Sequence, residues 1–332
     1  MKKKLLSLLV IVAIAAIILF LNYQRKVYHF SGYTMGTTYK VVIYDRFIDP
    51  EELRELKQQV SESLESLNKT FSTFNHDSEL SKLNKSGANE IVSVSKKMSE
   101  VLSISAKVHK LTNGYFDPTI DPLVRLWGFG RDFRNTYPSK QEIDNELINI
   151  GYESIIISGN IISKKKLVTV DFASIAKGYA VDIISEILMN SEKKDYLVEI
   201  GGELFVNGDE YFRNGWDVQI ANPAIPSNAS LMTIRIKNKG VATSGSYLNF
   251  REFGGKKYQH IIDPHNGYPV ENSLLSVTVI ADSTVFADAL ATGLIGMGLE
   301  KGLNLVNSLK EIEAIFIEKA KDGVEVTKSE GL

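Results

Sequence analysis

The sequence has 332 residues and contains no cysteine. This absence excludes structural disulfides, zinc sites built from thiolates, cysteine-ligated iron–sulfur clusters, a cysteine nucleophile and a thioether-linked lipid anchor. The common nucleotide-binding motifs are also missing, since there is no G-x-x-x-x-G-K-[ST] and no G-x-G-x-x-G between a strand and a helix. Any chemistry must therefore use oxygen and nitrogen groups and bound cofactors.

An excess of positive charge is lacking too. The chain carries 38 basic and 40 acidic residues, and 44% of its residues are hydrophobic, which is typical of a folded protein. Residues 1–26 contain several basic residues and no acid, so the remainder of the chain is mildly acidic. Such a surface does not attract phosphate backbones, and this disfavours a general nucleic-acid binder.

The N-terminus carries a long apolar run. It follows three lysines, extends from Leu5 to Leu21, and has Ser7 as its single polar member. At about 1.5 Å per residue it spans roughly 25 Å, slightly less than the hydrocarbon core of a bilayer. Small residues that could form a cleavage site lie inside the run, which favours an uncleaved anchor over a cleaved signal. We therefore expect residues 1–26 to anchor the chain in the cytoplasmic membrane and residues 27–332 to form one extracytoplasmic domain.

Beyond the apolar run, the expected strands and helices do not alternate regularly. The sequence therefore predicts an α+β fold of two interleaved lobes rather than a doubly wound sheet. Asp49 and Pro50 are typical of a helix start, and Ser139 with Glu142 forms a capping box. One predicted helix begins at about residue 50, and the others cover 96–111, 139–150, 175–189 and 284–299. The predicted strands cover 39–44, 167–170, 196–200, 216–220, 231–236, 258–262 and 274–280.

The segment from Asp171 to Tyr179 lies where an apolar strand is expected to lead into a helix. Its small residues would let a ligand approach the backbone, and free N–H groups at a helix start attract an anion. Lys177 can add a positive charge, and Asp171 can accept hydrogen bonds from a ligand. Alternatively, Asp171 merely caps the helix and Lys177 is solvated. These residues alone leave both interpretations open.

Asp288 and Thr292 are four residues apart in an apolar helix, so they share one face. Burying a carboxylate among apolar residues is costly unless a partner compensates its charge. Carboxylate and hydroxyl oxygens are the ligands that hard divalent cations prefer. The pair is therefore a candidate metal site, and the alternative is a solvated Asp288 near the helix start.

His260 is one of five histidines, and it lies at a predicted strand end before an Asp-Pro turn. A histidine in such a place is usually just half-buried, but beside a phosphate site it is a candidate for proton transfer. Aromatic residues gather in two turn-rich stretches, 71–84 and 112–119. They could cover a flat ring system or belong to the core.

Taken together and in this order, these segments resemble the ApbE family of FAD:protein FMN transferases. The resemblance extends from Met35 to the helix that contains Asp288, which is most of the chain after the apolar run. Its landmarks are Met35-Gly36-Thr37, Phe71-Ser72-Thr73-Phe74, Gly114-Tyr115-Phe116-Asp117-Pro118-Thr119, Trp127-Gly128-Phe129-Gly130, Asp171 to Tyr179, Glu199-Ile200-Gly201-Gly202-Glu203, Ala242-Thr243-Ser244-Gly245, His260-Ile261-Ile262-Asp263-Pro264 and Ala287-Asp288-Ala289-Leu290-Ala291-Thr292.

The resemblance implies magnesium-dependent transfer of FMN from FAD to a threonine or serine hydroxyl of an exported acceptor protein, with release of AMP. A metal and a lysine would neutralise the pyrophosphate as its bridge breaks. By the same resemblance, His260 is the candidate to take the proton of the acceptor hydroxyl. The implied FAD contacts are Met35, Phe74, Tyr115, Phe116, Asp117, Asp171, Lys177 and Ile261, and the implied metal shell is Asp288 and Thr292 with Ser174 and Ala291, the last two through backbone carbonyls.

Two other functions remain open. A related enzyme would hydrolyse FAD to FMN and AMP, with water in place of the protein hydroxyl. A non-catalytic module would bind FAD without turnover. The pairing of Asp288 with Thr292 argues against the module, because storage needs no metal at the pyrophosphate.

Overall fold

The centre of the molecule is an antiparallel sheet of eight strands in the order β1-β2-β6-β7-β10-β13-β14-β15. The computed structural model describes residues 25–129, 134, 136–210, 214–225, 229–246 and 249–332. Because β2 pairs with β6, the sheet joins segments far apart in the sequence. Its strands are β1 (Lys26–Thr34), β2 (Thr37–Asp45), β6 (Tyr196–Ile200), β7 (Glu203–Asn207), β10 (Lys239–Gly245), β13 (Leu274–Ala281), β14 (Glu313–Ala320) and β15 (Gly323–Lys328).

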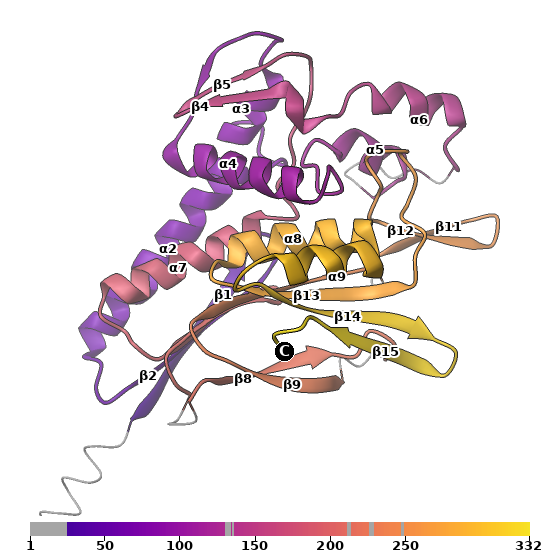
Figure 1. Ribbon diagram of the computed structural model, residues 1–332. Helices are drawn as coiled ribbons and strands as arrows, with labels where there is room; N and C mark the ends of the chain where they lie inside the picture. Colours follow the sequence, from indigo (N-terminus) through magenta and orange to yellow (C-terminus); the bar gives the residue numbers. More distant parts are fainter. Residues whose placement is uncertain (1–24, 130–133, 135, 211–213, 226–228, 247–248) are drawn as a thin grey trace, which may run out of the picture.

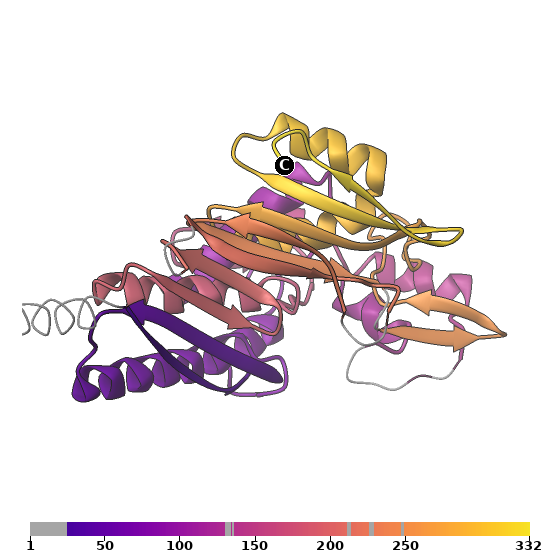
Figure 2. The ribbon, with the colours of Figure 1, turned by 90° about the horizontal axis from the view of Figure 1, so that it is seen from below.

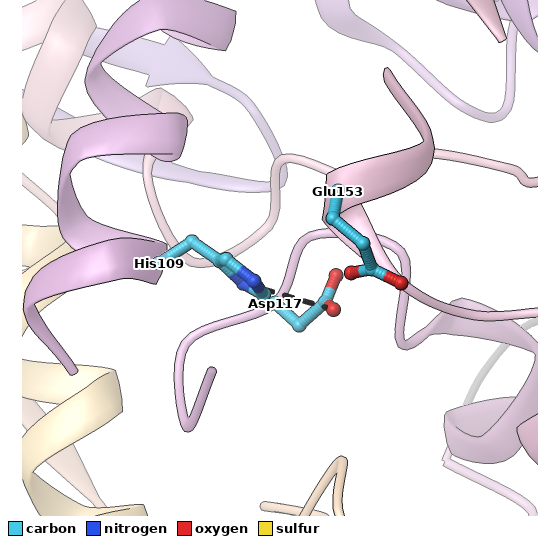
Figure 3. Close-up of side chains that lie close together, drawn as sticks. All are labelled: His109, Asp117 and Glu153. Atoms are coloured by element: carbon cyan, nitrogen blue, oxygen red, sulfur yellow. Dashed lines mark ion pairs between the residues drawn. The ribbon is translucent and has the colours of Figure 1, made fainter. Parts of the chain in front are cut away.

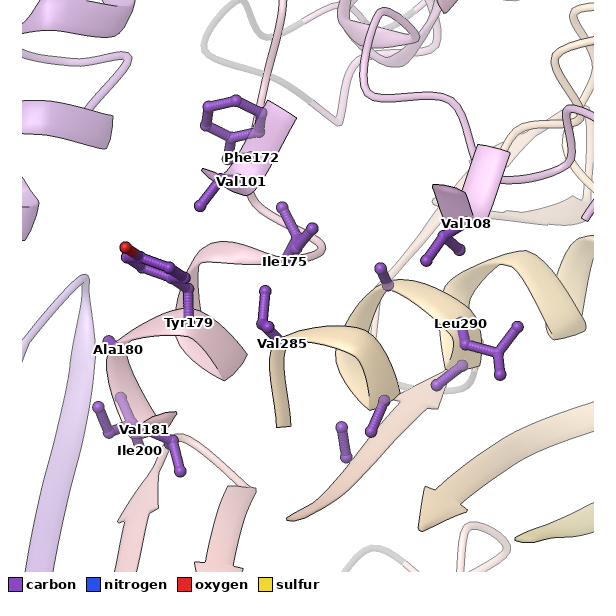
Figure 4. Close-up of a cluster of buried hydrophobic side chains, with 14 of the residues drawn as sticks. Val101, Val108, Phe172, Ile175, Tyr179, Ala180, Val181, Ile200, Val285 and Leu290 are labelled. Atoms are coloured by element: carbon purple, nitrogen blue, oxygen red, sulfur yellow. The ribbon is translucent and has the colours of Figure 1, made fainter. Parts of the chain in front are cut away.

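Helices cover one face of this sheet (Figure 1). Helices α7 (Ala176–Asn190) and α8 (Thr284–Met297) pack directly on the strands, and α9 (Leu299–Ser308) packs against β14. Helix α2 (Pro50–Phe71) packs on α7, and α4 (Lys96–Leu111) packs on α8. Helix α8 is apolar around most of its circumference because it lies between the sheet and these outer helices. Figure 4 shows the resulting core, to which α4, α7 and α8 all contribute side chains.

A smaller layer lies beyond α4. It contains the short helix α3 (Glu79–Lys85) and a three-stranded sheet in the order β3-β5-β4. The strands are β3 (Val92–Ser93), β4 (Ile155–Ser158) and β5 (Ile161–Lys164), and the 3-10 turn η1 (Tyr152–Ser154) precedes β4. The buried side chains of this layer belong to the same continuous core as α7 and α8. The small layer is therefore part of the same packed body as the large sheet.

The other face of the large sheet is covered by a hairpin of β8 (Trp216–Ala221) and β9 (Ser230–Ile236), with its own buried cluster around Trp216. Because both faces are covered, β13 is buried along almost its whole length. A third cluster around Trp127 joins α5 (Asp121–Leu126), α6 (Lys140–Leu147) and the hairpin of β11 (Phe250–Phe253) and β12 (Lys256–Gln259). Figure 2 shows this hairpin and these helices together at one end of the molecule.

Local sequence signals predicted several element boundaries. Asp49 caps α2 by accepting a hydrogen bond from the backbone of Glu51, and Ser139 with Glu142 forms the expected capping box at α6. The mixed α+β class is confirmed. Two predicted strands are wrong. Residues 167–170 pair with no strand in the described part of the chain. The strand predicted over 258–262 ends at Gln259, just before the cavity-lining residues His260 and Ile261.

Within the described residues, no helix is long and apolar enough to cross a membrane. The predicted anchor, residues 5–21, lies outside the described part of the chain.

Candidate active site

A cavity of about 800 Å³ opens between the large sheet, the start of α7 and the turns that follow α2 and α4. Its size is within the range of small-molecule and cofactor sites. Of the predicted site residues, only Ala291, which is fully buried in α8, does not line it. The predicted residues that line it are Met35, Phe74, Tyr115, Phe116, Asp117, Asp171, Ser174, Lys177, His260, Ile261, Asp288 and Thr292.

Asp288 lies where α7 and α8 approach each other most closely. Its Oδ2 accepts a hydrogen bond of 3.0 Å from the backbone N–H of Gly178, so a carboxylate of α8 satisfies a donor at the start of α7. A Cβ atom at position 178 would come within 2.5 Å of the carbonyl oxygen of Thr284 and 2.8 Å of the Asp288 Cβ. Glycine at 178 therefore allows the helix contact that positions Asp288.

The alternative of a solvated Asp288 is not supported, because the residue is only 3% exposed. Burial raises the pKa of the carboxyl, whereas Lys177 and the Gly178 N–H act in the opposite direction. One turn further along α8, the Thr292 hydroxyl lies 2.9 Å from the hydroxyl of Ser244 on β10. A buried carboxylate and a hydroxyl on one helix face are donors that fit a hard cation such as magnesium.

Lys177 and Glu203 form an ion pair in the wall of the same cavity. The Lys177 Nζ lies 3.5 Å from Glu203 Oε1, and the Glu203 side chain is almost fully buried. Burial alone would lower the pKa of Lys177, but Asp288 and Glu203 outweigh it, so that pKa lies above its ordinary value. Burial first and the charge of Asp288 second raise the pKa of Glu203 to about 8. Lys177 is therefore charged at neutral pH, next to two carboxyl groups.

Asp171 does not cap α7. The helix begins at Ala176 and its N-cap residue is Ile175, which makes no side-chain cap. The Asp171 carboxylate instead accepts a hydrogen bond of 2.6 Å from the backbone N–H of Ala173, while its own N–H donates to the carbonyl of Pro118. The second of these bonds connects the segment before α7 with the turn at Pro118, and residues of both segments line the cavity.

Aromatic side chains line the opposite part of the cavity. Phe71 makes edge-to-face contacts with Phe172 and Tyr179, with ring centroids 5.6 Å apart in each pair. These rings belong to the core, as one alternative predicted. Phe74 differs from them because it is 76% exposed while lining the cavity. It is an apolar ring available to a ligand.

Met35 occupies the two-residue turn between β1 and β2. Met35 and Gly36 both have positive φ, 48° and 75°, as a tight hairpin of right-handed twist requires. A non-glycine residue in this conformation is uncommon and is held here by the pairing of Thr34 with Thr37. The turn directs this end of the hairpin to the cavity, where Met35 is one of the lining residues.

Asp117 is held by the chain itself (Figure 3). Its Oδ1 accepts hydrogen bonds from the backbone N–H and the hydroxyl of Thr119, and its Oδ2 accepts one from the N–H of Tyr152. His109 and Glu153 approach the same carboxylate, with His109 Nδ1 3.8 Å from Oδ2. However, this nitrogen is also 2.9 Å from the carbonyl oxygen of Phe116. The cluster therefore fixes the turn that carries Phe116.

His260 follows directly after β12 and is half-buried in the cavity wall. Its backbone N–H donates to the carbonyl of Asn249, and its Nδ1 has no hydrogen-bond partner within the described residues. Burial lowers the pKa of the imidazole below its ordinary value. The imidazole is therefore neutral at neutral pH and can accept a proton.

Sequence reasoning assigned no role to two polar lining residues that contact the predicted site. Glu203 and Ser244 both lie in segments that were recognised as family landmarks, which was the one available signal. Their contacts with Lys177 and Thr292 join strands of the large sheet to helices that lie elsewhere in the sequence.

Comparison with known proteins finds similar sequences along nearly the whole chain. A relative from Vibrio cholerae serotype O1, named FAD:protein FMN transferase, is 35% identical over 317 residues, which cover 94% of this chain and 94% of the relative. A relative of the same name from Haemophilus influenzae is 34% identical over 345 residues, covering 98% of this chain and 96% of the relative.

Solved structures are similar too. The flavin transferase ApbE from Vibrio cholerae superposes with a TM-score of 0.83 at 35% identity, covering 92% of this chain and 98% of that one. The apo form of the Pseudomonas stutzeri flavinyl transferase ApbE also gives a TM-score of 0.83, at 34% identity and with 93% and 96% covered. The family model described as ApbE matches residues 35–316. This chain therefore belongs to the ApbE family.

Proposed function

We propose that the protein transfers the FMN part of FAD to a threonine or serine hydroxyl of an acceptor protein and releases AMP, in a magnesium-dependent reaction. The observation that carries this proposal is the cavity itself, which brings Asp288, Thr292 and Lys177 together with His260 and an exposed aromatic ring. Relatives named FAD:protein FMN transferase, which match nearly the whole chain, support the choice of reaction.

The apolar part of the cavity suits the flat, neutral parts of FAD. Phe74, exposed at the cavity wall, offers a ring face for stacking, and Met35, Tyr115, Phe116 and Ile261 supply further apolar surface. Asp117 would contribute by fixing the turn that carries Phe116, because its oxygens already accept hydrogen bonds from Thr119 and Tyr152. Asp171 lies at the cavity wall before α7, where it can accept a hydrogen bond from a ligand.

The polar part of the cavity suits the pyrophosphate. Lys177, charged between two carboxyl groups, would bind a phosphate oxygen. The side chains of Asp288 and Thr292, with the backbone carbonyl of Ser174, would hold magnesium at the cavity wall. The family resemblance adds the backbone carbonyl of Ala291, a residue that is buried in α8 and does not line the cavity. Bound magnesium would neutralise the negative charge that develops on the phosphates as their bridge breaks.

His260 would act as the general base. Its neutral imidazole, which lines the cavity, would take the proton of the acceptor hydroxyl while the acceptor oxygen bonds to the phosphorus of the FMN half. The bond from that phosphorus to the bridging oxygen breaks, and AMP leaves with the bridging oxygen. No oxidation or reduction is involved.

Incubation with FAD, magnesium and candidate exported proteins tests this function. We expect flavin fluorescence that stays with the acceptor after denaturation, together with one AMP for each flavin transferred. Free FMN as the main product under excess acceptor would instead identify an FAD hydrolase. FAD binding without any AMP would identify a flavin-binding module.

We further propose that residues 5–21 hold the chain in the cytoplasmic membrane with the catalytic domain outside. The lysines before the apolar run favour this orientation. Protease added to intact spheroplasts is therefore expected to digest the domain while a cytoplasmic marker protein survives. Full protection of the domain, or recovery of a soluble form that begins near residue 22, would contradict this location.

A further inference from the structure

One buried carboxylate of the cavity has no role in the function proposed above. Glu203 is 5% exposed and lines the cavity at the start of β7. Its Oε1 lies 3.5 Å from the Nζ of Lys177, whereas its Oε2 has no hydrogen-bond partner within the described residues. A buried carboxylate oxygen without a donor is unfavourable, so its position in a cavity wall indicates a donor brought by the ligand.

The backbone holds Glu203 firmly in this place. It pairs with Ile200 across a two-residue turn of Gly201 and Gly202, whose φ angles are 60° and 107°. The turn is packed so closely that a Cβ on Gly201 would lie 2.7 Å from the Thr37 side chain. In addition, Glu199 accepts a hydrogen bond of 2.7 Å from the N–H of Gly202. The carboxylate of Glu203 is therefore placed by a rigid turn.

The charged groups near Glu203 favour a hydrated cation as the source of the missing hydrogen-bond donor. Lys177 is the single lysine or arginine among the described residues that line the cavity, and it lies between the carboxyl groups of Glu203 and Asp288. Asp288 in turn acts electrostatically on Glu203. A divalent cation bound beside Glu203 and Asp288 would favour the ionised form of both buried carboxyl groups, in which their oxygens accept hydrogen bonds. A magnesium ion keeps several of its waters when it binds to one or two carboxylates, and those waters donate hydrogen bonds.

We propose that Glu203 belongs to the magnesium site as a residue that orients the ion through its water, with Oε2 accepting a hydrogen bond from a magnesium-bound water. This inference rests on the proposed function, because it uses the site that Asp288 and Thr292 form. Glu203 thus contacts the hydration of the ion in addition to pairing with Lys177.

Calorimetric titration with magnesium, in the presence of ADP as a pyrophosphate that carries no flavin, tests the proposal without any turnover. Glu203→Gln is expected to weaken magnesium affinity about 10–100-fold, the usual loss when a group that orients a metal's ligands is removed. Glu203→Asp keeps the charge but withdraws the carboxylate by one methylene, and we expect a similar loss. Glu186→Gln, on the exposed side of α7 and outside the cavity lining, should bind magnesium as the wild type does.

A second pair of variants separates a direct role from one exerted only through Lys177. In a Lys177→Met background, Glu203→Gln should still reduce magnesium affinity about tenfold or more. No further loss in that background, or unchanged affinity in Glu203→Asp, would overturn the proposal. Thermal unfolding of each variant, and its binding of ADP without magnesium, show whether the fold and the cavity are preserved.

The titration also separates this inference from the proposed function. If the wild type binds magnesium in a Glu203-dependent manner but transfers no flavin to any acceptor, the function is wrong and the inference stands. If magnesium affinity is the same in wild type and all Glu203 variants while transfer proceeds, the inference alone is wrong. If the wild type binds no magnesium, both are wrong.

Discussion

Asp288→Ala is expected to abolish turnover, and Asp288→Asn is expected to weaken magnesium affinity about a thousandfold. A unit charge about 4 Å from another contributes about 4 kcal/mol at an effective dielectric constant of about 20, which corresponds to roughly that factor. The asparagine variant preserves volume and can still accept the hydrogen bond from Gly178, so the contact of α7 with α8 should be maintained. The loss of magnesium affinity in this variant would then result from the missing charge.

Thr292→Ala should weaken magnesium binding less, because a neutral hydroxyl contributes no net charge. The measurement is a magnesium titration by calorimetry in the presence of an FAD analogue that cannot be cleaved. Asp121→Asn is a matched control, since Asp121 lines the same cavity but is paired with Arg125 at 3.1 Å. Wild-type magnesium affinity in Asp288→Asn would show that this carboxylate is only a structural partner of α7.

His260→Ala is expected to bind FAD and magnesium normally but to release AMP and label the acceptor about 10²–10⁴-fold more slowly, the usual cost of losing a general base. Binding should be preserved because neither contact depends on the imidazole proton. Rates of AMP release and of covalent flavin formation, measured side by side, check this. His76→Ala, a histidine outside the cavity lining, should transfer flavin at the wild-type rate.

The pH dependence of kcat/KM gives an independent test of His260 as the general base. The base must be neutral, so kcat/KM should fall as the pH decreases through the pKa of His260. Burial places that pKa below the ordinary value of 6.5, and the acid limb of the profile should therefore lie below pH 6.5. An unchanged acid limb and rate in His260→Ala would show that another group is the base. Asp117 would then be tested next, although its oxygens are already occupied by Thr119 and Tyr152.

The sequence predicts those parts of the structure that local chemistry determines. Asp49 before Pro50 and the Ser139–Glu142 pair mark helix starts because a capping side chain bonds to backbone only two or three residues away. The residues quoted for the family resemblance converge on one cavity for a different reason. They come from eight or more separate segments, and only the family pattern, not their spacing, indicated that these segments meet.

What the sequence could not predict depends on contacts between distant segments. Residues 167–170 have the composition of a strand, but no strand lies beside them, and Asn84 instead bonds to the backbone of Val170 through its side chain. The role of Asp117 as a fixed turn residue depends on Tyr152, which is far along the chain. Likewise, nothing near Glu203 in sequence reveals Lys177 as its partner.

The positions of the tryptophans allow flavin binding to be followed by intrinsic fluorescence. The chain has two tryptophans, and they lie in different clusters. Trp127 is fully buried, donates a hydrogen bond to Gly267 and packs in the cluster that includes Ile262, a residue of the cavity wall. Trp216 is the first residue of β8, in the hairpin that covers the other face of the sheet. In a Trp216→Phe variant, Trp127 would be the one remaining tryptophan and would fluoresce next to the cavity. Energy transfer from Trp127 to a bound flavin would quench this fluorescence, so its intensity would measure flavin binding without an added label.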